Sequence, residues 1–194
     1  MTSDQDHPGV SLFMNRGNHI VSGVVYLVKK PAFGNKSYEL TPRQTRELFH
    51  KNLWEKVVGF HTRNIVHRGH EHIQRKAAET IHADCILISP VVGRKKRGDF
   101  TSDAIIVAYQ TMLRHELYHP FPVILATFNT YARYSGPREA VFTALCRKNF
   151  GCSHFIIGRD HTGVGDYYKG FNLQDYCEQL GDLGIELMFF DTAM

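Results

Sequence analysis

Five short apolar runs recur along the chain, and each is bounded by polar or turn-forming residues. They lie at 57–60, 85–88, 122–127, 154–157 and 185–190. Short runs without alternation are typical of strands that are buried on both faces. Stretches with helical spacing separate them, at 67–81, 101–117, 137–149 and 172–180. Pro137 stands at one helix start and Gly151 just beyond one helix end, as helix boundaries favour.

Strands that alternate with helices in this way predict a doubly wound α/β domain with a parallel sheet. Right-handed helical crossovers cover both faces of such a sheet, which agrees with the apolar character of the runs. Ligands bind beyond the carboxyl ends of the strands, where the strand order reverses. The loops that follow residues 60, 88, 127 and 157 are therefore the candidate site.

The beginning of the chain has weaker signals. Residues 1–22 show no sustained periodicity, and we expect a loose N-terminal arm there without a core. Residues 23–30 (GVVYLVKK) predict a further strand. Thr41 and Gln44 form a capping-box pattern, which predicts a helix from there to about residue 53.

Composition narrows the classes of function. The 194 residues are 43% hydrophobic and 22% charged, as in globular proteins, and the net charge of +4 is too small for a dedicated nucleic-acid binder. A secretory leader and an apolar run of about 18 residues are both absent, so we expect a cytoplasmic protein without a membrane partner. Four cysteines without zinc-type spacing are expected to be reduced thiols.

Several of the twelve histidines cluster directly after the first buried strand, in the segment HTRNIVHRGHE at 61–71. His67 and His70 are three residues apart at a helix start, where free N–H groups and the helix dipole attract anions. Gly69 leaves room for a ligand, and the guanidinium of Arg63 suits phosphate oxygens. The pattern predicts a phosphate site. One alternative is a pair of histidines without a ligand, either on the surface or hydrogen-bonded in the core. A metal site is another, although no third ligand has a recognisable spacing.

Three other segments combine charge with glycine. Residues 92–99 (VGRKKRGD) fit either a mobile loop that closes over a polyphosphate or a solvated surface segment. Residues 158–168 (GRDHTGVGDYY) follow a strand, and Arg159 there suits a second anionic group, whereas the alternative is a glycine-rich turn. Residues 136–140 (GPREA) fit an anion-binding helix start and a simple capped start equally well.

Together these segments resemble the signature sequences of the ATP sulfurylase (sulfate adenylyltransferase) family. HTRNIVHRGHE, GPREA and RKNFGCSHFIIGRDHTGVGDYY occur in the usual order, and the resemblance runs from about residue 23 to the last residue. It implies a Rossmann-like nucleotidyltransferase catalytic domain of the HxGH type over 23–194. The implied reaction transfers AMP from MgATP to sulfate and releases pyrophosphate. The partners are then small molecules, and the resemblance leaves a homo-oligomer open.

The resemblance also implies roles for individual residues. Catalysis is expected from Thr62, Arg63, Asn64, His67 and His70. ATP is expected to bind Arg63, Asn64, His67, Gly69, His70, Gly158, Arg159, Asp160, His161 and Ala193. The acceptor anion is expected beside His61, Arg63, Arg159 and Thr162, without a metal ion held by protein side chains.

The chain departs from the family pattern beside the acceptor. The family usually has glutamine at the position of His61, proline at Ile65 and alanine at Thr162. Sulfate is the expected acceptor, and a phosphonate, carboxylate or phosphate ester is the alternative. A non-catalytic nucleotide-binding subunit is the competing class. A larger domain usually precedes this one and a small lobe follows it, so we expect a minimal catalytic domain or a truncated form.

Overall fold

One parallel sheet forms the centre of the domain. The computed structural model describes residues 2–29, 36–93, 95, 98–158 and 163–190. Within these ranges the strands are β1 (Val57–Thr62), β2 (Cys85–Pro90), β3 (Val123–Leu125), β4 (His154–Ile157) and β5 (Glu186–Phe189). Their order in the sheet is β3-β2-β1-β4-β5, and every pair is parallel. The predicted fold class and all five runs of the repeating part are confirmed.

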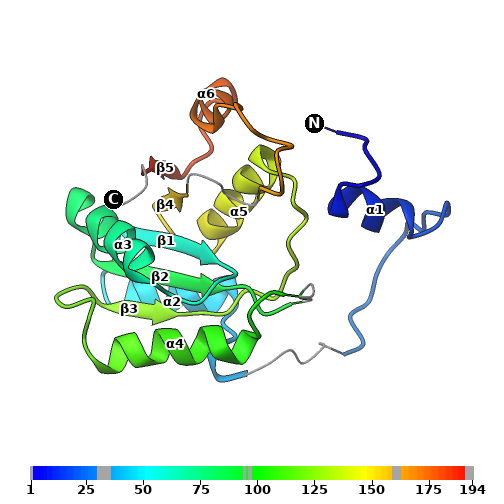
Figure 1. Ribbon diagram of the computed structural model, residues 1–194. Coiled ribbons are helices and arrows are strands. Elements are labelled where there is room, and N and C mark those ends of the chain that lie inside the picture. Colours follow the sequence, from blue (N-terminus) through cyan, green and yellow to red (C-terminus); the bar gives the residue numbers. More distant parts are fainter. Residues whose placement is uncertain (1, 30–35, 94, 96–97, 159–162, 191–194) are drawn as a thin grey trace.

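Helices connect the strands, as predicted (Figure 1). They are α2 (Pro42–Lys51), α3 (Arg68–Ile81), α4 (Ser102–Arg114), α5 (Pro137–Asn149) and α6 (Leu173–Gln179), and a short 3-10 helix, η1, spans Lys36–Tyr38. The predicted capping box is present, because the Thr41 hydroxyl accepts the Gln44 N–H and the Gln44 side chain accepts the Thr41 N–H. Among the described residues, no helix combines the length and apolarity that a membrane span requires.

The sheet separates two hydrophobic clusters. Val58 and Phe60 of β1 belong to the cluster with α3 and α4, whereas Val57 belongs to the cluster with α2 and α5. Successive side chains of a strand point to opposite faces. Gly59 and His61 therefore lie on the α2 and α5 face.

The strand order places the candidate site. The chain moves from β1 to β2 and β3 on one side, and then returns to add β4 and β5 on the other side of β1. The order reverses between β1 and β4, so the loops after Thr62 and Ile157 meet at this switch point.

The prediction of a strand at residues 23–30 was wrong. Residues 23–29 form neither helix nor strand and pair with no strand in the described part of the chain, and Lys30 lies outside it. The side chains of Val24, Val25 and Leu27 are 84%, 90% and 80% exposed. Strand propensity reflects packing against neighbouring strands, and these residues have no sheet edge beside them.

The loose arm predicted at 1–22 contains a helix, α1 (Pro8–Met14), which stands away from the sheet on the side of the carboxyl ends of β1 to β3 (Figure 1). His7 caps this helix, because its Nδ1 accepts the N–H of Gly9 at 3.1 Å. His7 is also buried, and its Nε2 lies 2.8 Å from the Tyr134 carbonyl. Part of the arm is thus packed, contrary to expectation, since a histidine cap carries little sequence signal. The domain boundary at residue 23 stays a prediction.

Candidate active site

The loop after β1 turns on the side chain of Thr62. The Thr62 hydroxyl accepts the N–H of Asn64 at 3.1 Å and donates to the carbonyl of the same residue at 3.2 Å. Thr62 is buried, whereas Asn64 is exposed. This hydroxyl therefore fixes the turn that presents Arg63 and Asn64 beyond the end of the strand.

His67 and His70 stack on each other at the start of α3. Their ring centroids are 3.8 Å apart and their planes differ by 28°. His67 is the N-cap residue, and its Nδ1 accepts the N–H of Gly69 at 3.2 Å. A Cβ on Gly69 would lie 3.1 Å and 3.2 Å from atoms of the His67 ring. Gly69 therefore accommodates the folded-back His67 ring, which is a more local reason for glycine than the predicted room for a ligand.

The His70 imidazole is neutral at physiological pH. Burial, and then the charge of neighbouring His67, lower the pKa of His70 to about 4, while a weaker backbone interaction with Ile65 acts in the opposite direction. The ring meets Phe60 edge-on at 5.4 Å. Its Nδ1 is buried and makes no hydrogen bond of normal geometry within the described residues. Such a buried nitrogen is suited to an oxygen of a bound anion.

Arg63 lies against an aromatic ring that the sequence did not indicate. Its guanidinium carbon is 5.2 Å from the centroid of the Tyr134 ring, and its NH1 is buried without a hydrogen-bond partner among the described residues. Tyr134 is 7% exposed and has a left-handed φ of 57°. The Tyr134 carbonyl accepts the hydroxyl of Tyr168 at 2.8 Å. Because Arg63 and Tyr134 are far apart along the chain, no local pattern could have revealed their contact.

Glu139 of α5 holds the loop that carries Tyr134. Its buried carboxylate accepts the N–H of Arg133 at 2.9 Å and the N–H of Ser135 at 3.1 Å. Arg138, in contrast, is exposed. The GPREA segment therefore organises the loop beside Arg63 through its glutamate.

The loop after β2 comes near the same arginine. The ammonium group of Lys95 donates to the Val91 carbonyl at 2.7 Å. Burial lowers the pKa of Lys95, Asp99 opposes this shift, and the positive charge of Arg63 adds to it. Lys95 and Asp99 are thus electrostatic neighbours of Arg63, as expected for loops that meet at one sheet edge. The other three cations of this segment, Arg94, Lys96 and Arg97, lie outside the described residues.

The remaining predicted ligands come from the end of β4 and from the end of the chain. Gly158 directly follows β4, and a Cβ there would meet no atom of the described residues within 4 Å, so its backbone is open to a ligand on their side. Arg159, Asp160, His161, Thr162 and Ala193 lie outside the described residues, and their contacts stay predictions. Among the residues that are described, no three His, Cys, Asp or Glu side chains are grouped to hold a metal ion.

His61 lies on the opposite face of β1 from Thr62. Its ring meets Phe128 edge-on, with centroids 5.9 Å apart. The register of β1 and β2 sets His61 beside Ser89, whose buried hydroxyl has no hydrogen-bond partner in the described ranges. The predicted anion residue His61 therefore borders a polar region at the carboxyl edge of the sheet.

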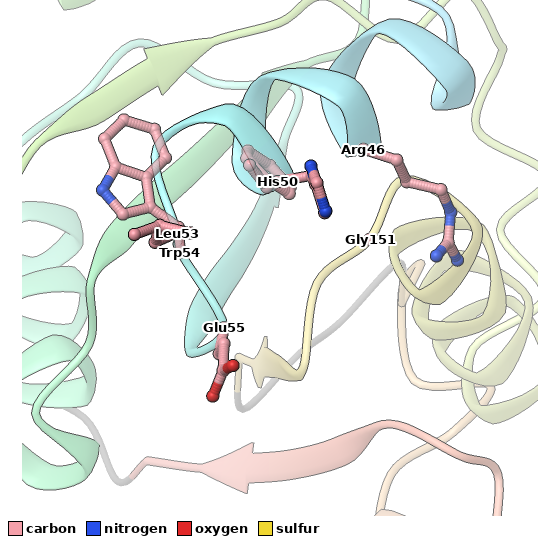
Figure 2. Close-up of a pocket in the computed structure, with 7 residues that line it drawn as sticks. Arg46, His50, Leu53, Trp54, Glu55 and Gly151 are labelled. Atoms are coloured by element: carbon pink, nitrogen blue, oxygen red, sulfur yellow. The ribbon is translucent and has the colours of Figure 1, made fainter.

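A separate pocket lies at the other end of the sheet (Figure 2). Its volume is about 490 Å³, and the residues that line it are Arg46, Phe49, His50, Leu53, Trp54, Glu55 and Gly151. Residues 53–55 precede β1, and Gly151 precedes β4, so the pocket opens at the amino ends of the strands. It is therefore distinct from the predicted phosphate site.

The fold and the loop after β1 define a class of protein. This is a doubly wound α/β domain with an HxGH motif at the start of the helix that follows its central strand. The family model described as ATP-sulfurylase matches residues 36–194. The chain belongs to the ATP-sulfurylase family, and the resemblance found in the signature segments is confirmed.

The chain is also similar to curated proteins that are named sulfate adenylyltransferase. The chain is 44% identical to a sulfate adenylyltransferase of Pyrococcus abyssi over 193 residues, which cover 99% of this chain and 50% of the relative. It is 45% identical to a sulfate adenylyltransferase of Symbiobacterium thermophilum, with 98% and 48% covered. The chain thus spans about half the length of the curated relatives it matches.

A solved structure supports the fold. The hexameric APS kinase from Thiobacillus denitrificans superposes with a TM-score of 0.62 at 20% identity, over 83% of this chain and 29% of that one. At this identity the similarity concerns the fold alone.

Proposed function

We propose that this domain transfers the adenylyl group of MgATP to sulfate, giving adenylyl sulfate and pyrophosphate. The observation that supports this most strongly is that one loop at the switch point, between β1 and α3, carries both Arg63 and the stacked pair His67 and His70. Arg63 and His70 each carry a buried nitrogen without a hydrogen-bond partner among the described residues. Buried donors of this kind are costly to a fold unless a ligand uses them.

The chemistry requires positioning and charge stabilisation. A sulfate oxygen attacks the α-phosphorus, the new O–P bond forms, and the bond from that phosphorus to the pyrophosphate oxygen breaks. Sulfate is already ionised, so no general base is needed. His67 and neutral His70 would donate hydrogen bonds to charge that develops on the phosphoryl oxygens, and Arg63 would hold the anion in line. Thr62 would act as a positioning residue, because its hydroxyl fixes the turn.

The nucleotide would extend from this loop to the end of β4. The open backbone at Gly158 supports this placement. Asn64, Gly69, Arg159, Asp160, His161 and Ala193 complete the proposed ATP site. Mg²⁺ would enter with the nucleotide as part of the substrate and would offset the charge of its phosphates. Cytoplasmic location and self-association stay predictions.

His61 favours a second candidate for the acceptor. An imidazole, unlike the family's glutamine, can become cationic, and a third cation beside Arg63 and Arg159 is favourable only next to a strongly charged anion. A phosphate ester or a phosphonate would meet this requirement, and Thr162 would alter the fit of a tetrahedral group.

One screen tests the proposal. Pyrophosphate release from MgATP is measured with sulfate, phosphonates, carboxylates and phosphate esters, and the adenylylated product is identified by mass. We expect release to depend on sulfate. Binding of MgATP by calorimetry without release for any acceptor would indicate a nucleotide-binding subunit. No binding at millimolar MgATP, from a folded sample, would overturn the nucleotide site.

A further inference from the structure

Arg147 in the last turn of α5 is completely buried. Its stem crosses β1 at Gly59, where a Cβ would lie 3.1 Å from the Arg147 Cγ. The guanidinium carbon lies 4.3 Å from the ring centroid of Phe128 and 5.0 Å from that of Phe150. All three guanidinium nitrogens are buried without a hydrogen-bond partner in the described part of the chain. In the part of the chain that the structure describes, aromatic faces therefore hold this cation, and no oxygen atom accepts a hydrogen bond from it.

Within the described residues, no group neutralises the charge of Arg147. Burial lowers the pKa of Arg147 to about 10, so the group stays cationic at neutral pH. The Cys152 thiol lies beside it, but burial raises the pKa of Cys152 to about 12, so this thiol is not an anion. No ion pair described in the structure includes Arg147. The carbonyls at the end of α5 favour a cation only weakly.

The side chain of Arg147 is directed toward His61, where the acceptor anion is expected. Gly59 and His61 lie on the same face of β1, and His61 is nearer the carboxyl end. Phe128 lies beside both Arg147 and His61. Its ring is under the Arg147 guanidinium, and it meets the His61 ring edge-on with centroids 5.9 Å apart. Arg147 is thus at most about 10 Å from the His61 ring. Ser89, also beside His61, adds a buried hydroxyl to this region.

We propose that Arg147 determines specificity in the acceptor site by supplying a fixed positive charge behind Phe128 and His61, which favours a doubly charged anion over a singly charged one. This inference rests on the proposed position of the acceptor beside His61. Between buried groups a charge acts over such a distance with less screening than in water. An unpaired buried cation costs stability, and the proposal gives this cation a role in binding the anion.

The test compares two tetrahedral anions of similar shape and different charge, the doubly charged sulfate and the singly charged perchlorate. Their dissociation constants are measured by calorimetry in the presence of Mg²⁺ and α,β-methylene-ATP, which cannot transfer its adenylyl group. Arg147→Met removes the charge and keeps an unbranched apolar stem, and Arg147→Lys keeps the charge. Arg114→Met is the control, because Arg114 stands exposed in the last turn of α4.

We expect Arg147→Met to weaken sulfate binding by about tenfold and perchlorate binding by only about threefold, because the interaction scales with the charge of the anion. Arg147→Lys should keep most of the wild-type ratio between the dissociation constants of perchlorate and sulfate. Arg114→Met should leave this ratio unchanged. Thermal unfolding is measured in parallel. The Met variant should be at least as stable as the wild type, since an apolar side chain replaces an unpaired buried charge.

A merely structural arginine would give a different pattern. Loss of stability with an unchanged sulfate-to-perchlorate ratio would overturn the inference, and so would an equal loss for both anions. If Arg147→Met fails to fold, Arg147→Gln provides the same comparison. If the wild type binds the nucleotide analogue but no sulfate, the proposed acceptor site itself is wrong, which the wild-type arm reveals before any variant is considered.

Discussion

The guanidinium of Arg63 lies over the ring of Tyr134, 5.2 Å from its centroid, and joins the loop after β1 to the loop that precedes α5. Glu139 holds the second loop because its carboxylate accepts two backbone N–H groups. The Tyr134 carbonyl accepts a hydrogen bond from the Tyr168 hydroxyl. The orientation of a residue at the end of one strand is therefore set by a loop from a distant part of the sequence.

This contact predicts that Tyr134 positions Arg63. Replacement by alanine should lower kcat by about tenfold, since a partly buried cation–π contact contributes roughly 1 to 2 kcal/mol. Tyr134→Phe keeps the aromatic face and should stay within about twofold of the wild type. Steady-state kinetics with circular dichroism checks both variants. Equal losses in the alanine and phenylalanine variants would show that the hydroxyl, and not the ring face, matters.

The proposed donors are tested by His70→Ala and Arg63→Ala. Each should lower turnover by a factor of about 100 to 1,000 while the fold is kept, because removal of one preorganised donor typically costs roughly 3 to 4 kcal/mol. His72→Ala is the matched control, since His72 lies on the same helix but is exposed. Pyrophosphate release at saturating MgATP gives the comparison. Turnover within about threefold of the wild type in both variants would place the reaction centre elsewhere.

The lowered pKa of His70 predicts acid-sensitive stability. Between its ordinary value of 6.5 and the folded value of about 4, the unfolded chain binds a proton that the folded protein excludes. The free energy of unfolding should therefore fall as the pH falls through this window, and His70 should add no further loss below it. Urea unfolding at pH 7.5 and pH 4.5 measures the effect. His70→Gln cannot take up this proton, so its loss of stability should be smaller than that of the wild type.

The acceptor preference should depend on His61 and Thr162, where the family usually has glutamine and alanine. Sulfate is the proposed acceptor, and the second candidate, a phosphate ester or a phosphonate, should compete with it more strongly in the wild type than in a pocket with the family residues. The double variant His61→Gln with Thr162→Ala should shift the ratio of kcat/KM values toward sulfate. A wild type that already prefers sulfate, with a ratio that does not move, would show that these positions do not set specificity.

The sequence by itself determined the repeating part of the fold. Short apolar runs that alternate with helical stretches are typical of a parallel sheet covered by helices, so β1 to β5 and the helices between them followed from local pattern. The loop after β1 was also recognisable, because the residues of the HxGH motif are close together in the chain and stack on one helical turn.

Tertiary structure decided what depends on distant partners. Residues 23–29 have strand-like composition but no neighbouring strand in the described part of the chain, and α1 is held by the contact of His7 with Tyr134. The contacts of Arg63 with Tyr134 and of Arg147 with Phe128 likewise join segments far apart in sequence. Local periodicity reports which face of an element is buried, but burial of a charge or orientation of a guanidinium depends on the side chains that the fold brings against it.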